Sequence, residues 1–125
     1  MRLITHNMLK SNIKGVENGF PLTIEASQIY EEEAEFNADF MQQLIPKLEW
    51  AAVRAAVGQL GLEIELPPED QDIGEMKESE EFLRTLHHIL FEVHVIEGDL
   101  VCPETGRKFP IVNGIPNMLL HEDEV

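Results

Sequence analysis

The stretch "VHVIEGDLVCPETGRKFPIVNGIPNMLL" (residues 93–120) changes the pattern of the chain from helical to extended. Apolar residues lie on both sides of Gly98-Asp99, which predicts two strands joined at that step. A hairpin is predicted at Asn113-Gly114, because a type I′ turn needs positive φ at both of its central residues. The final apolar run contains Pro116, which cannot donate to a strand ladder, so we expect an edge strand there.

Helical patterns occupy the middle of the chain. The segment "EFNADFMQQLIP" predicts a helix that Asn37 caps through its side-chain oxygen and that Pro46 ends or kinks. In "LEWAAVRAAVGQLG" the larger apolar residues follow one helical stripe from Trp50 to Leu60. A third helix is predicted in "SEEFLRTLHHILFEV", with Ser79 as its cap.

The order of these elements indicates an α+β protein. Near the N-terminus, Thr5 is expected to cap a short helix, and "PLTIEASQIY" alternates as a strand does. We therefore predict a sheet domain built from both chain ends, residues 1–35 together with 92–125. The inserted helical subdomain is expected to span residues 36–91 and to contain a mobile acidic loop over 63–78.

The composition limits the possible functions. The 125 residues carry a formal net charge of -15, and a field of that sign repels phosphate backbones, which argues against independent nucleic-acid binding. The single cysteine excludes an intramolecular disulfide and fits a reducing compartment. The first residues lack the long apolar run of a signal peptide, and no stretch approaches the ~20 apolar residues of a membrane span. We expect a protein of the cytoplasm and nucleus that does not bind membranes.

No active site is evident among the reactive side chains. Cys102 is the only thiol, and the histidines are not spaced to join it in a tetrahedral zinc site. His87 and His88 point about 100° apart on a helix, so we expect one at the core boundary and the other in solvent. The carboxylates form runs typical of a solvated surface, and the sequence has no phosphate-binding loop or nucleophile elbow.

The apolar end of the chain is the strongest functional signal. Ile115, Met118, Leu119 and Leu120 lie within six residues of one another. A bare apolar edge strand invites aggregation unless something covers it. Either these side chains pack on the protein's own helices, or a partner pairs with the strand by β-augmentation, and the pattern alone leaves both open.

Four segments, "MRLITHNMLKSNIKGV", "GFPL", "EFNADFMQQLIPKLEW" and "LHHILFEVHVIEGDLVCPETGRKFPIVNGIPNMLL", resemble the small methyltransferase-activator subunit family of eukaryotes. The resemblance runs in order along nearly the whole chain. It implies a zinc-ribbon-like antiparallel sheet from both termini with an inserted helical subdomain. It also implies a non-catalytic subunit that forms heterodimers with class I S-adenosylmethionine-dependent methyltransferases, activates them and keeps them soluble. Partners in the family methylate tRNA, 18S rRNA and a translation release factor, so RNA would be contacted only through the partner.

The resemblance also implies where a metal and a partner would bind. Some fungal members hold zinc with two cysteine pairs, and the matching positions here are Ser11, Val16, Cys102 and Thr105. Because three of the four are not cysteine, we expect no zinc and no other cofactor, with S-adenosylmethionine bound by the partner. The expected partner interface consists of Ile115, Pro116, Asn117, Met118, Leu119 and Leu120, with Asn7, Met8 and Phe20 nearby at the same end of the sheet.

Two other functions are weighed against this one. The first is a stand-alone RNA-binding or structural zinc-ribbon-like module, and the net charge of -15 argues against RNA binding. The second is a small enzyme. The sequence argues against it, because it shows no activated nucleophile, no set of metal ligands and no cofactor-binding loop.

Overall fold

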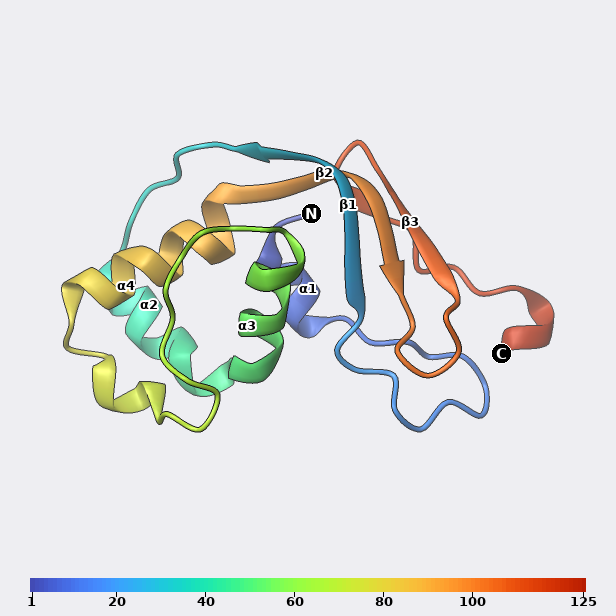
Figure 1. Cartoon of the computed structure of the whole chain (residues 1–125), viewed down its shortest axis with the longest axis horizontal. Helices are drawn as coiled ribbons and strands as arrows, with labels where there is room; N and C mark the ends of the chain where they lie inside the picture. Colours follow the sequence, from blue (N-terminus) through green and yellow to red (C-terminus); the bar gives the residue numbers. More distant parts are fainter.

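A four-stranded sheet and a group of short helices make up the protein, and the computed structural model describes residues 1–125 (Figure 1). The strands are β1 (Thr23–Glu31), β2 (Val93–Val101), β3 (Lys108–Val112) and β4 (Ile115–Pro116). They lie in the order β1-β2-β3-β4, and each is antiparallel to its neighbour. The predicted α+β class and the antiparallel sheet drawn from both chain ends are confirmed.

The helices in the middle of the chain form where the local sequence predicts them, and a short helix precedes β1. They are α1 (Leu3–Met8), α2 (Ala38–Leu44), α3 (Trp50–Gln59) and α4 (Glu80–His87), and a π-helical turn (His88–Glu92) links α4 to β2. The caps are confirmed: Asn37 Oδ1 accepts from the Phe40 amide at 3.1 Å, and Ser79 Oγ accepts from the Phe82 amide at 3.3 Å. None of the helices has the length and apolar character that a bilayer crossing requires.

Helix α1 begins earlier than predicted, and Thr5 is not its cap. Arg2 forms an isolated antiparallel bridge with His94, so the helix starts at Leu3, directly after a residue held by β2. His6 is then buried, and its Nε2 donates to the Leu22 carbonyl oxygen at 2.7 Å. Burial lowers the pKa of His6, which keeps the imidazole neutral at physiological pH.

Strand β2 runs straight through Gly98, so the predicted turn at Gly98-Asp99 is wrong. Gly98 instead allows the backbones of β1 and β2 to lie close together. A Cβ at Gly98 would lie 2.3 Å from the Glu25 carbonyl oxygen of β1, next to a register shift between Ala26 and Gln28. Nothing in the local sequence separates such a glycine from a turn glycine.

The hairpin at the chain end is confirmed, but its second strand is shorter than predicted. Asn113 and Gly114 have φ values of 51° and 78°, as a type I′ turn requires. Strand β4 ends at Pro116, and the Asn117 amide makes one more bond to the Pro110 carbonyl at 2.9 Å. The Asn117 side chain then accepts from the Leu119 amide at 3.0 Å, which turns the chain out of the strand.

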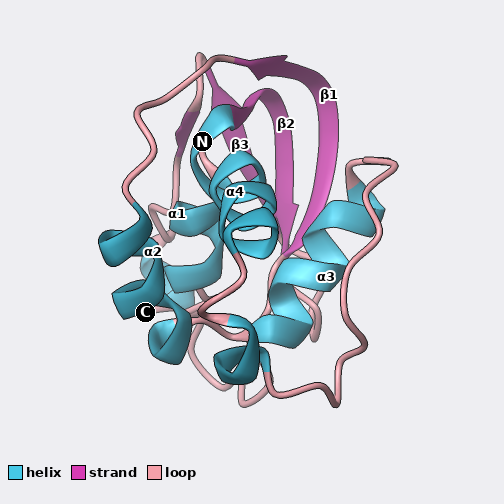
Figure 2. Ribbon diagram, turned by 90° about the vertical axis from the view of Figure 1, so that its left-hand side faces the viewer, coloured by secondary structure: helices cyan, strands magenta, loops and turns pink.

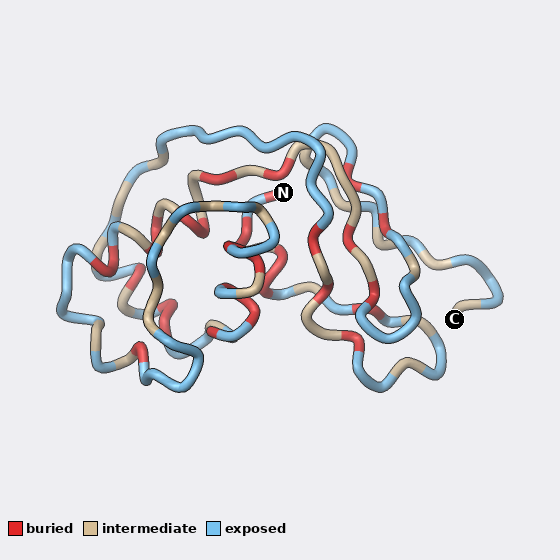
Figure 3. The backbone as a smooth tube through the Cα atoms, viewed as in Figure 1, coloured by how far each residue is buried: buried red, intermediate tan, exposed pale blue.

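One apolar core lies between the helices and the inner face of the sheet (Figures 2 and 3). Strand residues Ile24, Leu100 and Phe109 are buried in the same cluster as residues of α2, α3 and α4. The division of the chain at residues 36–91 stays a prediction. The acidic loop is tied to this core, because Ile73 is buried and Trp50 Nε1 donates to the Pro67 and Pro68 carbonyls at 3.3 Å.

Candidate partner-binding surface

A shallow hollow of about 710 Å³ lies on the outer face of the β3–β4 hairpin and the segment that follows it. We call it the C-terminal hollow. Along β3, Phe109 and Ile111 point into the core, whereas Pro110 and Val112 point outward into the hollow. Its full lining is Pro110, Val112, Asn113, Ile115, Pro116, Asn117, Met118 and Leu119.

The apolar residues at the chain end divide between the core and the surface. Met118 and Leu120 are half-buried and pack against the core. Ile115 is 69% exposed and Leu119 is 78% exposed. Each of the two alternatives left open by the sequence therefore holds for part of the segment: alternate side chains support the fold, and the others face solvent.

Strand β4 is an edge that offers an acceptor but no donor. Val112 pairs with Ile115, and the Asn117 amide bonds to Pro110, so the residue between them, Pro116, directs its main chain toward the free edge. Proline has no N–H, which leaves only its carbonyl oxygen for a partner strand. A partner that binds this edge must therefore gain most of its contact from exposed side chains such as Ile115 and Leu119.

Four predicted interface residues do not line the C-terminal hollow: Leu120, which packs against the core, and the three described next. Met8 is 57% exposed at the end of α1, and Phe20 is half-buried beside a different hollow formed by residues 10–20. Asn7 is buried, with its amide nitrogen donating to the Glu49 carbonyl and its oxygen accepting from the Glu49 amide, both at 3.1 Å. This side chain therefore joins α1 to the start of α3, and contact between Asn7 and a partner stays a prediction.

Replacing Asn7 by alanine is expected to lower the free energy of unfolding by about 1–3 kcal/mol, because two partly buried hydrogen bonds to the main chain of Glu49 are lost. Urea titration followed by circular dichroism measures this loss. Asn12→Ala is the control, since Asn12 is exposed. An Asn7→Ala chain as stable as the unmodified one would contradict the structural role.

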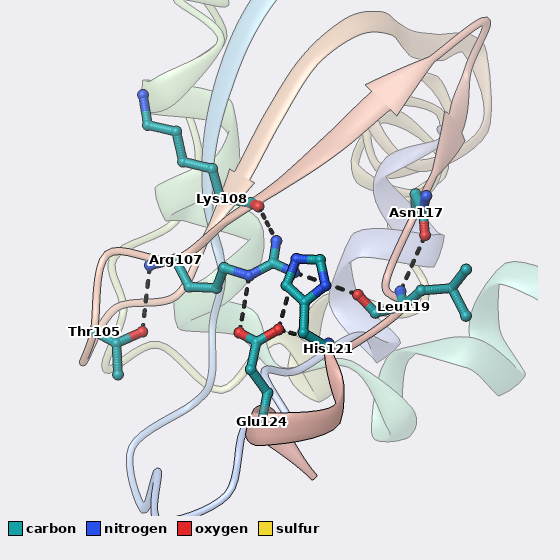
Figure 4. Close-up of polar contacts among 7 residues, drawn as sticks. All are labelled: Thr105, Arg107, Lys108, Asn117, Leu119, His121 and Glu124. Atoms are coloured by element: carbon teal, nitrogen blue, oxygen red, sulfur yellow. Dashed lines mark hydrogen bonds and ion pairs between the residues drawn. The ribbon is translucent and has the colours of Figure 1, made fainter.

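Arg107 holds the segment after β4 in place, a role that the sequence did not reveal (Figure 4). Its guanidinium donates to both carboxylate oxygens of Glu124, at 2.9 and 3.1 Å, and to the Leu119 carbonyl at 3.4 Å. It also donates to the Lys108 carbonyl and lies over the Phe109 ring, 4.6 Å from the ring centre. Arg107 therefore holds the segment that carries the exposed Leu119 at two points, the Leu119 carbonyl and the Glu124 carboxylate.

The ion pair predicts how this segment responds to acid. The hydrogen bonds from Arg107 hold the pKa of the Glu124 carboxyl below its ordinary value of 4.5. A lowered folded-state pKa means that the contribution is complete at neutral pH, begins to fall below about pH 4.5, and is lost as the pH passes the folded value. NMR of the Leu119 amide and the Glu124 carboxyl should show that the segment leaves Arg107 only in this acidic range.

A neutral variant provides the matched test at pH 7. Glu124→Gln is expected to shift the Leu119 amide resonance, whereas Glu122→Gln is not, because the exposed Glu122 carboxylate forms no ion pair. Equal spectra for the two variants would show that Arg107 does not hold the segment.

The positions that match the fungal zinc ligands do not form a metal site. Cys102 is buried and the Ser11 hydroxyl is buried beside it without an oxygen or nitrogen partner, while Val16 packs on the core and Thr105 is exposed. Nowhere do three His, Cys, Asp or Glu side chains converge as ligands. One thiol with hydroxyl and apolar neighbours does not meet the four-ligand requirement of structural zinc.

The paired histidines lie as predicted. His87 is buried and its Nε2 donates to the Glu35 carbonyl at 3.0 Å, whereas His88 is partly exposed beside Glu92 and Glu31. Neither histidine lies beside a nucleophile or a group of metal ligands, and each makes a hydrogen bond within the fold.

The sequence is similar to proteins of one known family along nearly its whole length. The family model described as Trm112p-like protein matches residues 2–114. The chain is 58% identical to the multifunctional methyltransferase subunit TRM112 homolog A of Arabidopsis thaliana over 100% of both chains. It is 51% identical to the TRM112-like protein of Bos taurus (99% and 98% covered) and 31% identical to TRM112 of Saccharomyces cerevisiae (96% of each).

A solved structure shares the fold. One chain of the E. cuniculi Mtq2-Trm112 complex, described as responsible for methylation of the eRF1 translation termination factor, superposes with a TM-score of 0.63 at 20% identity, covering 95% of each chain. The family match spans the helices and the sheet up to the hairpin turn, and the full-length relatives extend it through the C-terminal hollow. The chain therefore belongs to the Trm112p-like family.

Proposed function

We propose that this chain is a non-catalytic subunit that binds, activates and stabilises S-adenosylmethionine-dependent methyltransferases. The observation that carries the proposal is the C-terminal hollow, where Val112, Ile115 and Leu119 are exposed together at a sheet edge. Exposed apolar surface of this kind is typical of a protein-binding site. Relatives that are 31% to 58% identical are named multifunctional methyltransferase subunits, which supports the same class of partner.

A subunit of this kind needs no chemistry of its own. A partner that places an apolar surface in the hollow buries Ile115 and Leu119. Binding to its folded state stabilises that partner by an amount that grows with the logarithm of the affinity of the complex. Activation then follows if the bound partner keeps its cofactor-binding loops ordered. The catalytic subunit supplies S-adenosylmethionine and the substrate site.

The family resemblance supplies the finer proposal. The partners would be class I methyltransferases, each bound as a heterodimer, and they would act on tRNA, 18S rRNA and a translation release factor. The net charge of -15 supports indirect contact with RNA, since the chain itself repels phosphate. The same charge attracts a basic, RNA-binding catalytic subunit and speeds association. Both the cytoplasm and the nucleus hold such substrates, so we propose both locations.

Affinity purification of the C-terminally tagged chain from its own cells tests the function. We expect several S-adenosylmethionine-dependent methyltransferases in roughly stoichiometric amounts, and no methyl transfer by the isolated chain. Recovery of RNA without a methyltransferase, or tight binding of tRNA by the isolated chain, would favour the stand-alone RNA-binding function. Methyl transfer by the isolated chain would make it an enzyme and would contradict the proposal.

We also propose that the fold holds no zinc. Elemental analysis of the purified chain is expected to find well under one zinc per chain, because Cys102 is the only thiol and no ligand set converges on it. Treatment with a chelator should leave the melting temperature unchanged. One tightly bound zinc per chain, or unfolding by the chelator, would contradict this expectation.

A further inference from the structure

Strand β1 forms the edge of the sheet opposite β4, and most of it is exposed. It pairs only with β2, so its other side has no neighbouring strand. Residues 25–33, which cover most of β1 and the start of the segment after it, are all exposed (Figure 3). Two large apolar side chains lie in this stretch, since Ile29 is 39% exposed and Tyr30 is 56% exposed. This edge therefore combines an open main chain with exposed apolar side chains, the features that a docking strand uses.

The open side of β1 offers both hydrogen-bond donors and acceptors. The Glu32 amide donates to the Glu92 carbonyl at 2.8 Å, so Glu32 directs its main chain toward the β2 side. The register from Ile29 to Glu31 is unbroken, and main-chain direction alternates along an antiparallel strand. Ile29 and Glu31 therefore direct their N–H and carbonyl groups to the open side. A strand that lies there can bond to both groups of both residues, whereas β4 offers only the carbonyl of Pro116.

Unpaired carboxylates lie beside these apolar residues. A cavity of about 480 Å³ lies at the end of β1, and its carboxylates are those of Glu31, Glu32, Glu33, Glu35 and Glu92. The His88 ring lies between two of them, 3.4 Å from Glu31 and 2.9 Å from Glu92. The other three form no ion pair, and the arginine at the cavity, Arg84, is paired with Glu80. The charge of this region is therefore complementary to a basic occupant.

The alternation of side chains defines which segment fits. Ile29 and Glu31 lie on one face of β1, while Tyr30 and Glu32 lie on the other. Each face thus offers an apolar residue followed by an acidic one, and an antiparallel occupant with two basic residues followed by two apolar ones matches both faces. A second copy of the chain does not match, because glutamates would face glutamates on two molecules that each carry a net charge of -15.

We propose that the open side of β1 over residues 29–32, here called the β1 edge, is a second docking site, which binds a basic extended protein segment by β-augmentation. Main-chain hydrogen bonds to Ile29 and Glu31 hold the segment, Tyr30 packs on its apolar residues, and the unpaired carboxylates bind its cations. The site lies on the opposite edge of the sheet from the C-terminal hollow, so the two are occupied independently. The proposal does not rest on the proposed function.

Titration of the isotope-labelled chain with a peptide tests the β1 edge directly. The probe is the end-blocked peptide Thr-Thr-Arg-Lys-Val-Val-Thr-Thr, and NMR follows both binding and hydrogen exchange. At saturation, exchange of the Ile29 and Glu31 amides is expected to slow by about fivefold or more. The same peptide with its four central amides N-methylated keeps its charge but loses those donors, and it is expected not to bind. No binding by the probe, equal binding by the methylated peptide, or unchanged exchange at these two amides would overturn the proposal.

Two chains with the same change of net charge test the carboxylates. The edge variant carries Glu32→Gln, Glu33→Gln and Glu35→Gln. The control variant carries Glu69→Gln, Asp70→Asn and Glu78→Gln, at exposed positions of the acidic loop. The affinity for the probe peptide is expected to fall by about tenfold in the edge variant and by less than about twofold in the control. Equal losses would show that net charge alone attracts the peptide and would overturn the proposal.

A third comparison separates the β1 edge from the C-terminal hollow. Ile29→Pro removes an N–H on the open side of β1 and is expected to weaken peptide binding by about tenfold, with circular dichroism as the check on folding. Leu119→Asp is expected to leave peptide binding unchanged, because Leu119 lines the hollow. The opposite pattern would place the peptide in the hollow and overturn the proposal. If the chain binds the peptide but no methyltransferase, the proposed function fails and the β1 edge stands.

Discussion

Replacing Leu119 by aspartate is expected to lower affinity for a methyltransferase partner by about 30-fold or more while leaving the fold intact. Leu119 is 78% exposed in the free chain, so a charge there meets water and costs little stability. In a complex that covers the C-terminal hollow, the same carboxylate would be buried against apolar surface without a partner. Co-purification and calorimetric titration measure the loss, and circular dichroism checks the helical content.

Two further variants separate the interface from the core. Tyr30→Asp places the same charge at an exposed position on β1, the opposite edge strand, and is expected to bind the partner normally. Met118→Asp is expected to reduce stability as well as binding, because Met118 packs on the core. If Leu119→Asp binds as tightly as the unmodified chain, the partner does not use the C-terminal hollow.

Gly98→Ala is expected to reduce the free energy of unfolding by about 1–3 kcal/mol, because the new methyl group forces two paired strands apart. The added Cβ would stand 2.3 Å from the Glu25 carbonyl oxygen and 2.9 Å from the Ala26 Cα, and both are backbone atoms that cannot rotate away. Strand β2 would have to shift against β1 near the register irregularity.

The control for Gly98 is a glycine with open space around it. Gly58 lies in α3, and a Cβ there would meet nothing within 4 Å. Gly58→Ala is expected to raise the free energy of unfolding by about 0.5–1 kcal/mol, because alanine favours the helix. Urea titrations of both chains provide the comparison, and equal stabilities would mean that β1 and β2 adjust freely at Gly98.

Local chemistry explains the features that the sequence predicted correctly. The caps at Asn37 and Ser79 involve an amide three residues away, and the Asn113-Gly114 turn depends on the φ preferences of two neighbours. The break of α2 before Pro46 likewise follows from a missing N–H within the same turn. Element order predicted a sheet built from both chain ends, because strand patterns occur on either side of the helices. The family resemblance, and not the order, implied that its strands are antiparallel.

Contacts between distant segments decided the rest. Gly98 lies within a strand because the backbone of β1 packs directly against it. Asn7 is buried because its side-chain amide bonds to the main chain of Glu49, which is far along the sequence. The sequence placed six residues at the partner edge as one group. Only the tertiary structure shows that Met118 and Leu120 belong to the core while Ile115 and Leu119 face solvent. The physical reason is that exposure and hydrogen-bond partners are set by what the rest of the chain places beside a residue, which a local pattern does not contain.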